Sequence, residues 1–522
     1  MTPHPVWALP ERLKWTEDPF SQSNWSFQLH TLRWIDPLRR VALADVAESA
    51  EAKARWLAVT TSWIDGCLLS ENAVAWKDMA VGVRTIELVL GFPLVPPEER
   101  AKFLFCIRIH AKHLANWRNH ARGNHLLHQL QGLYVAARFL RDARLEAAAL
   151  RHAAKLLTES FDEEGVNAEG ALGYHDMNIH WWGQLSERLS GEDNSLPGLN
   201  DTLRTARGAI IHAVRPDGKL ETIGDTASSK RPLVSVGPRV RYVRSRGREG
   251  RKPSELARCF RDGYAFGRSG WGRGRRRFED ETFYSLRFGP DKSMHGHRDS
   301  TSFTIHARRI SWVVDPGMYA YGNSEMRAYM CSRAAHNVVL DTRRPNYPNN
   351  EARLVTHRLG KSLDAYRMET VPSPQLRVRR DFVYHREGEF FVVVDRIEEV
   401  GGGVPEHARQ LWHLGHGVEV EATSAGYKLS ASSRTAYVEW ANPGSRELIV
   451  GETAPLQGWV SGRYGEAVEA PVLSVGPSAG GGPLAAVLSI GRPCTSFRLC
   501  YETGVEVIEV ELGGVAYVVT LP

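Results

Sequence analysis

The chain has 522 residues, more than one ordinary hydrophobic core accommodates, so two or three domains are expected. Its content of 42% hydrophobic and 24% charged residues is typical of globular proteins, and no apolar run is long enough to cross a bilayer. The net charge of +6 is concentrated in residues 239–277, which hold fourteen Lys or Arg against three acids. Such a stretch suits a polyanion or is a solvated linker, and no nucleic-acid-binding motif accompanies it.

The N-terminus shows no basic region followed by an apolar run, so the sequence predicts no signal peptide. We therefore expect a cytoplasmic protein, or a periplasmic or secreted one if an export signal was removed. Neither nucleic acid nor a membrane is expected as a partner, and the oligomeric state is left open. The cysteines form no CxxC pair and are interpreted as free thiols: Cys67, Cys106, Cys259, Cys331, Cys494 and Cys500.

The first half of the chain is predicted to be helical. Residues 1–40 are irregular and are expected to pack on a domain formed by residues 41–235, in which apolar residues recur with the helical period. Short breaks with Gly, Pro, Asn or Asp separate predicted helices at 41–61, 74–90, 97–117, 125–141, 143–160, 181–189 and 199–214. Consecutive helices with short links predict stacked helical hairpins.

The second half is predicted to be an antiparallel β-sandwich, so the fold class is multidomain α+β. Residues 236–262 form the basic linker, and the sandwich occupies residues 263–522. Gly-rich turns separate short predicted strands at 283–288, 302–306, 338–340, 390–394, 409–414, 436–440 and 516–521.

The stretch from Met294 to Asp315 is predicted to be a β-hairpin with a polar cluster at its mouth. On its first strand, His295 and His297 would point to the same face because side chains alternate. Asp315 ends the return strand, and His336 precedes a further apolar strand. Two histidines and one aspartate brought together by strands can hold a zinc-type ion, and a third histidine would remain for chemistry.

A second polar cluster lies in the helical half. Asn124 follows a glycine where a helix opens, and it is either an N-cap or a substrate ligand. His125 and His128 are three residues apart and share a helix face, although His128 is equally read as a surface or structural histidine. Tyr174 lies in a Gly-rich loop, where functional residues concentrate. Trp181 either stacks on a sugar ring or belongs to a helix core.

Five motifs in chain order carry a resemblance to a known family. They are Gly-Asn-His-Leu-Leu at 123–127, Glu-x-x-x-x-Tyr-His at 169–175, His-Gly-His-x-Asp-x-x-Ser-Phe at 295–303, Val-Asp-Pro-Gly-x-Tyr at 314–319 and Arg-Ala-Ala-His-Asn-Val-Val at 333–339. Together they resemble the heparinase II/III superfamily of polysaccharide lyases. The resemblance covers most of the chain. It implies an N-terminal α/α toroid, an incomplete barrel of helical hairpins, followed by a C-terminal antiparallel β-sandwich.

The resemblance also implies roles for individual residues. Asn124 and His125 would sit at the substrate carboxylate, Tyr174 would be the catalytic acid/base, and His295 would complete the site. A structural zinc, or another divalent metal, would be held by His297, Asp315 and His336. Further substrate contacts are expected from His128, Glu169, Trp181 and Arg298.

The implied reaction is β-elimination, in which a proton leaves the carbon beside a carboxylate and the bond to the 4-oxygen breaks. Donors such as Asn124 and His125 would stabilise the developing enolate by about 10²–10³ in rate each. Acid–base catalysis by Tyr174 would add about 10²–10⁴, if nearby cations lower the pKa of its hydroxyl. His125 or His295 is the alternative base when the proton lies on the opposite ring face.

The sequence therefore predicts a polysaccharide lyase acting on an acidic polysaccharide. A glycosaminoglycan of heparan sulfate, hyaluronan or chondroitin type is favoured because the basic stretch suits highly charged chains. Alginate or a bacterial exopolysaccharide is the alternative substrate. A non-catalytic polysaccharide-binding protein, or a zinc hydrolase with an open coordination position, are the alternative functions.

Overall fold

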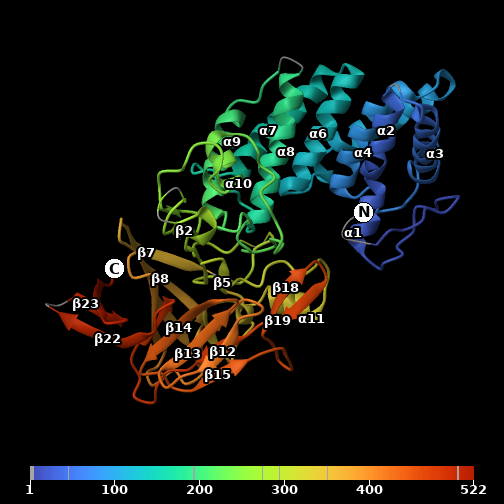
Figure 1. Ribbon diagram of the computed structural model, residues 1–522. Helices are drawn as coiled ribbons and strands as arrows, with labels where there is room; N and C mark the ends of the chain where they lie inside the picture. Colours follow the sequence, from blue (N-terminus) through green and yellow to red (C-terminus); the bar gives the residue numbers. More distant parts are fainter. Residues whose placement is uncertain are drawn as a thin grey trace. The chain divides into compact units, whose positions relative to one another are not determined.

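The computed structural model describes residues 5–44, 46–191, 194–272, 274, 276–292, 294–349, 351–502 and 505–522 (Figure 1). It forms two compact units, the first from residues 1–160 and 181–201 and the second from residues 161–180 and 202–522. This grouping differs from the expected boundary near residue 235. Segments before that boundary bond to the strand-rich part: the Gly170 amide donates to the Met294 carbonyl (2.7 Å), and Arg268 donates to the Val214 carbonyl (2.8 Å).

The first unit is helical, as predicted from the apolar period. Its helices are α1 (Ser23–His30), α2 (Asp36–Leu43), α3 (Ser49–Cys67), α4 (Asp78–Gly91), α5 (Arg100–Ala115), α6 (Gly123–Leu140) and α7 (Ala143–Ser160). Two helices are divided between the units, α8 (Leu172–Ser190) and α9 (Leu199–Ile210). The second unit adds α10 (Pro238–Arg244) and α11 (Glu325–Met330). The predicted helix at 41–61 is wrong in its bounds, because this stretch contains the end of α2 and most of α3.

Helices that follow one another pack as pairs, α2 with α3, α4 with α5 and α6 with α7, and α4 also packs on α6. Large aromatic side chains such as Trp56, Trp63 and Phe103 fill the core of this unit. The α4 and α6 backbones touch, because a Cβ atom on Gly132 would lie 2.5 Å from the Gly82 carbonyl oxygen. This close approach fixes the position of α6 along α4. Helix α6 carries three of the candidate residues, Asn124, His125 and His128.

The second unit is built from antiparallel sheets. The five-stranded sheet has the order β1 (Ala257–Phe260), β2 (Tyr264–Arg268), β3 (Phe283–Arg287), β4 (Phe303–Ala307), β5 (Ile310–Val313). The eight-stranded sheet has the order β12 (Glu419–Ala422), β13 (Gly426–Ala431), β14 (Arg434–Ala441), β21 (Leu484–Ile490), β10 (Phe390–Glu399), β9 (Leu376–His385), β8 (Leu363–Ser373), β7 (Ala352–Leu359).

Smaller sheets complete this unit. The four-stranded sheet has the order β15 (Arg446–Ile449), β20 (Val472–Val475), β11 (Ala408–His413), β6 (Val339–Asp341). Two hairpins pair β16 (Glu452–Thr453) with β17 (Leu456–Gln457) and β18 (Trp459–Arg463) with β19 (Glu466–Glu469). The last sheet has the order β22 (Cys494–Glu502), β23 (Val505–Leu512), β24 (Val515–Thr520).

The main core of the second unit lies between facing sheets, as in a sandwich. Phe303 and Trp312 of the five-stranded sheet and Trp412 of the four-stranded sheet share one buried cluster with Phe382 and Phe391 of the eight-stranded sheet. Burial of each such side chain contributes about 1.5–3 kcal/mol. The predicted order of an α/α toroid followed by a β-sandwich is thus confirmed.

Two local predictions are wrong. The β4–β5 hairpin forms as expected, but His295 and His297 lie in the irregular segment before β4, and His295 has a φ of +59°. They therefore do not share a strand face. The predicted basic linker, residues 236–262, is partly regular structure, since it contains all of α10 and all of β1.

Among the described residues, no helix combines the length and apolar character needed to cross a bilayer.

Candidate active site

The helical candidates lie at the start of α6. Asn124 is the second residue of this helix and is buried, so its predicted role as the N-cap is wrong; the cap position belongs to Arg122. His125 is more exposed, and its Nδ1 lies 2.9 Å from the Oδ1 of Asp78 in α4. The α4–α6 contact thus brings a carboxylate to the histidine, which holds its ring in place.

His128 is buried rather than on the surface. Its ring lies edge-on to that of Trp181, with 5.0 Å between the ring centroids. Burial, together with the nearby Arg33 guanidinium, lowers the pKa of His128 to about 3. His128 is therefore a neutral side chain packed on a half-buried tryptophan, and the two predicted substrate contacts lie side by side.

In the second unit, Tyr174 and His295 are stacked. Their ring centroids are 3.5 Å apart and the planes differ by 11°. Tyr174 is the third residue of α8 and not part of a loop, so the predicted loop ends earlier than expected. The hydroxyls of Tyr174 and Tyr321 are also in contact. The predicted acid/base and the predicted third histidine are therefore direct neighbours.

Three glycine-bearing segments pack backbone against backbone around this pair. A Cβ on Gly170 would lie 2.7 Å from the Cα of Gly296, and one on Gly224 would lie 2.5 Å from the Gly170 carbonyl oxygen. Gly224 also has a φ of +62°, which favours glycine. Because no side chain separates these segments, the residues that follow each glycine come together. We call this contact the glycine seam.

Asp225 is the central carboxylate of the site, and the sequence did not indicate it. Its Oδ2 lies 3.1 Å from His295 Nδ1, and its Oδ1 lies 3.2 Å from His297 Nε2. Arg327 of α11 donates through both terminal nitrogens to both carboxylate oxygens. Burial raises the pKa of Asp225, but the hydrogen bonds from His295, His297 and Arg327 outweigh it and hold the pKa below its usual range. Asp225 therefore stays ionised and orients His295.

The pKa of Tyr174 is raised, whereas the sequence analysis considered a pKa lowered by nearby cations. Burial, the Tyr321 hydroxyl and the charges of Asp225 and Glu169 all raise it above its ordinary value. Glu169 is itself buried, and its Oε2 lies 3.8 Å from His295 Nε2. With its pKa raised, Tyr174 keeps its hydroxyl proton and can donate it. His295 lies between two carboxylates, those of Asp225 and Glu169.

His297, Asp315 and His336 are brought together as predicted. One ligand atom from each lies within 4.8 Å of the others, and all three residues are buried. His336 Nδ1 bonds to the Ser332 carbonyl (2.7 Å), which leaves Nε2 facing Asp315 Oδ2 at 3.6 Å. Within the described chain this Nε2 has no hydrogen-bond partner. A buried nitrogen lone pair beside a carboxylate is a chemically suitable arrangement for a divalent cation.

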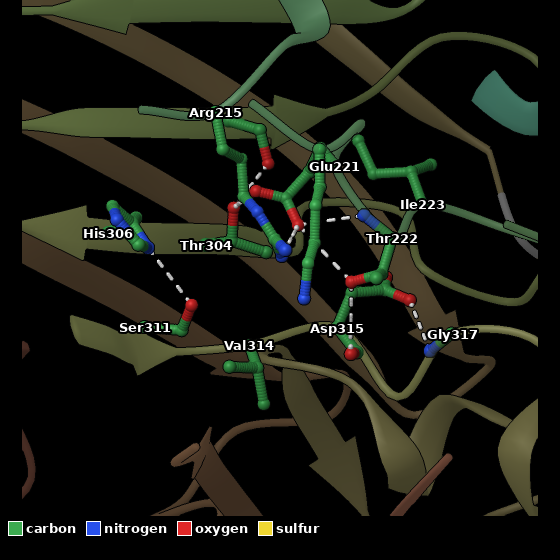
Figure 2. A network of polar contacts seen from close by, with 12 residues as sticks. Arg215, Glu221, Thr222, Ile223, Thr304, His306, Ser311, Val314, Asp315 and Gly317 are labelled. Atoms are coloured by element: carbon green, nitrogen blue, oxygen red, sulfur yellow. Dashed lines mark hydrogen bonds and ion pairs between the residues drawn. The ribbon is translucent and has the colours of Figure 1, made fainter. Parts of the chain in front are cut away.

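A buried polar network lies behind Asp315 (Figure 2). Burial raises the pKa of the Asp315 carboxyl well above its usual value, and its Oδ1 accepts from the Gly317 amide at 3.0 Å. The Thr222 hydroxyl lies 3.2 Å from both the Asp315 carbonyl oxygen and Glu221 Oε1. Glu221 in turn accepts from Thr304 of β4 at 2.8 Å. The network ties Asp315 to the segment that leads to Asp225.

Arg298 is the candidate least involved with the others. Its Nη1 donates to the Asn346 carbonyl oxygen at 3.0 Å, in an exposed position. The backbone amide of Arg298 donates to the Cys331 carbonyl at 2.9 Å. Cys331 is a free thiol, as are the other cysteines. The role of Arg298 in substrate binding stays a prediction.

Comparison with known proteins settles the family. The model described as "Heparinase II/III N-terminus" matches residues 2–236, and "Heparinase II/III-like, C-terminal" matches residues 261–476. The chain belongs to the heparinase II/III family. A search of curated proteins gives no match.

Solved structures share the fold of this heparinase II/III family member. Heparinase III superposes with a TM-score of 0.80 at 17% identity, covering 97% of this chain and 85% of that one. A heparan sulfate lyase HepC mutant from Pedobacter heparinus gives 0.76 at 18%, covering 100% and 86%. Chondroitin AC lyase from Streptomyces coelicolor A3 gives 0.61 at 10%, covering 93% and 79%.

Proposed function

We propose that this protein is a polysaccharide lyase that cleaves a uronic-acid-containing glycosaminoglycan by β-elimination. The observation that carries the proposal is the stacked Tyr174–His295 pair, held by ionised Asp225 in a chain with both heparinase II/III domains. Similar folds belong to proteins named heparan sulfate lyase and chondroitin AC lyase. Heparan sulfate and chondroitin-type chains are therefore the first substrates to test.

The proposed reaction uses the protonated state of Tyr174. A base takes the proton beside the uronate carboxylate, the bond to the 4-oxygen breaks, and Tyr174 gives its proton to that oxygen. Asp225 accepts a hydrogen bond from His295 Nδ1, so His295 Nε2 carries the lone pair and can take the proton. Asn124 and His125 are proposed to bind the carboxylate, and His125 is the alternative base for the other uronate epimer.

The decisive experiment is ultraviolet absorbance during incubation with heparan sulfate, heparin, hyaluronan, chondroitin sulfates and alginate. Elimination creates a carbon–carbon double bond conjugated to a carboxylate, which absorbs, whereas hydrolysis does not. A rise on a glycosaminoglycan supports the proposal. A rise in absorbance with alginate alone would change the proposed substrate from a glycosaminoglycan to alginate. Binding without any rise in absorbance would favour a polysaccharide-binding protein.

We also propose that His297, Asp315 and His336 hold a structural zinc ion. Two imidazoles and one carboxylate are ordinary zinc ligands, and the Asp225–His297 contact is of the kind that orients a ligating histidine. When bound, the ion would add positive charge and cross-link the segments around His295. Burial lowers the pKa of His297, but hydrogen bonds to Asp225 and Cys331 raise it to about 10, so a cation competes with a proton there.

Metal analysis tests the zinc proposal. We expect one zinc per chain, lost in His336→Gln and retained in His306→Gln, which changes another buried histidine of the same unit. Chelation should lower the melting temperature, and folded protein without metal should retain elimination. Activity that follows metal content in protein that stays folded would instead support a catalytic ion.

A further inference from the structure

The outer face of the eight-stranded sheet changes character along its strands. At one end Ala365, Val383, Val392 and Val394 are buried under β22–β24. Side chains alternate along a strand, so the same face continues into positions 377 and 379 of β9 and 396 of β10. These positions are arginines, and β7–β10 run there beside a large hollow. The face is therefore apolar where it is covered and cationic where it is open.

This hollow has a volume of about 1070 Å³, large enough for several sugar units by comparison with ordinary ligand pockets. We call it the arginine groove, after the five arginines that line it: Arg261, Arg353, Arg377, Arg379 and Arg396. Three glutamates also line it, Glu351, Glu369 and Glu398. None of the candidate active-site residues is among the lining residues.

Part of this charge is neutralised within the protein. Arg353 pairs with Glu369 at 2.6 Å, and Arg396 pairs with Asp381 at 2.7 Å and with Glu506 at 2.5 Å. In the described residues, no ion pair joins the side chains of Arg261, Arg377 or Arg379 to a carboxylate, and Arg379 Nε is buried without a hydrogen-bond partner. Outside these pairs, three arginines and two glutamates, Glu351 and Glu398, line the groove, so its cationic groups exceed its anionic ones by one.

The positions of the arginines favour an extended ligand. Arg379 lies in register between Glu369 of β8 and Arg396 of β10, and Arg377 lies two residues along β9. Arg261 approaches from the β1–β2 turn. Guanidinium groups bind carboxylate and sulfate in a bidentate manner. Cations spread over separate segments of an open groove match anions repeated along a chain better than one compact anion.

We propose that the arginine groove is a second binding site for an acidic polysaccharide, distinct from the site that cleaves it. The groove holds a distant part of a long chain through its carboxylate or sulfate groups. The identity of the chain rests on the proposed function, whereas the existence of the site does not. Long chains then gain affinity from two points of attachment.

Binding tests the site independently of turnover. Tyr174→Phe protein is titrated with size-fractionated heparin, hyaluronan, chondroitin sulfate and alginate tetrasaccharides in a calorimeter. We expect two sites for at least one of them, and one site after Arg377→Ala and Arg379→Ala are added. The control pair Arg108→Ala and Arg434→Ala changes the charge equally at exposed positions outside the groove and should leave two sites. Binding that the groove substitutions leave unchanged, whether at one site or at two, would overturn the proposal.

Turnover provides the second readout on the chain that the enzyme cleaves. In the active protein, the Arg377→Ala/Arg379→Ala pair should raise KM for the long polymer about tenfold, equivalent to about 1.4 kcal/mol, with kcat unchanged. Turnover of a tetrasaccharide should stay the same. Equal losses on both lengths would place these arginines in the cleaving site and contradict a second site. If no chain is cleaved, the proposed function fails, and the calorimetric result still decides on the groove.

Discussion

His128 and His295 are both predicted site histidines, but their surroundings differ in charge. His128 is buried against Trp181, and the charged groups that act on it are cationic, so its ring is neutral. His295 is stacked on Tyr174 and bonds to the ionised Asp225, which is itself paired with Arg327. His128 is thus a neutral, packed side chain, whereas His295 belongs to the group of residues that we propose to transfer protons. The residue type alone does not distinguish them; the partners do.

The strongest test of the proton-transfer group is Tyr174→Phe. Removing the hydroxyl takes away the proposed proton donor and keeps the ring that stacks on His295. We expect kcat to fall by about 10²–10⁴, measured by ultraviolet absorbance, with oligosaccharide affinity nearly unchanged. Tyr437→Phe in β14, outside the candidate site, should have no effect. Retained turnover would transfer the acid role to another group, with Tyr321 as the first candidate.

The next largest effect is expected for Asp225→Asn. The amide keeps the shape of the side chain but no longer neutralises Arg327 or orients His295. Loss of such an orienting carboxylate costs about 10–100-fold in activity, and we expect kcat to fall more than KM rises. Asp280→Asn, which removes a carboxylate from the more exposed pair with Arg309, should change the unfolding free energy little, because solvent screens such a pair, and should leave kcat intact.

A second variant separates a loss of stability in Asp225→Asn from a loss of catalysis. Removing one partner of a buried pair destabilises by about 3–5 kcal/mol because the other charge stays unpaired. Arg327→Gln added to Asp225→Asn should restore much of the unfolding free energy without restoring kcat. If kcat recovers together with stability, Asp225 has only a structural role.

The last test, which concerns stability rather than turnover, is a pH dependence at His128. Its pKa is about 3 in the folded protein and about 6.5 when unfolded, so between these values only the unfolded state takes up the proton. Stability from this group is complete above pH 6.5 and falls with acidification by about 1.4 kcal/mol per pH unit. His128→Gln lacks this loss.

Urea unfolding at several pH values measures this difference. The unfolding free energies of the wild type and His128→Gln should converge as the pH falls from 6.5 toward 4. A constant gap would show that His128 is protonated in the folded state, and the contrast with His295 would then disappear.

The fold was predictable because helix and strand periodicities are local. The predicted helix at 143–160 has the same bounds as α7, and β3, β4 and β11 lie within one or two residues of their predicted ranges. His297, Asp315 and His336 lie together as the spacing and motif order predicted. Tyr174 and His295, which the same motifs pointed to, are also neighbours, and the roles of all five residues stay predictions.

The charged partners of the site were not predictable, because each comes from a distant segment. Asp225 lies 70 residues from His295 and 102 residues from Arg327, and Tyr321 lies 147 residues from Tyr174. A single acid in a turn at 223–225 carries no local pattern that reveals its contacts. The expected lowering of the Tyr174 pKa was wrong for the same reason: the nearby carboxylates and Tyr321 could not be seen in the sequence.

The glycine seam has a consequence for hydrogen exchange. Its amides at Gly170 and Asp225 are bonded to the carbonyls of Met294 and His295, and no flexible side chain lies between the segments. Deuterium can enter each amide only when its hydrogen bond opens, and the close backbone packing favours an opening in which the three segments separate together. Peptides around residues 170, 225 and 295 should therefore exchange slowly and at a common rate. The residues around Tyr174 and His295 would then unfold as one cooperative unit, although they come from three separate segments of the sequence.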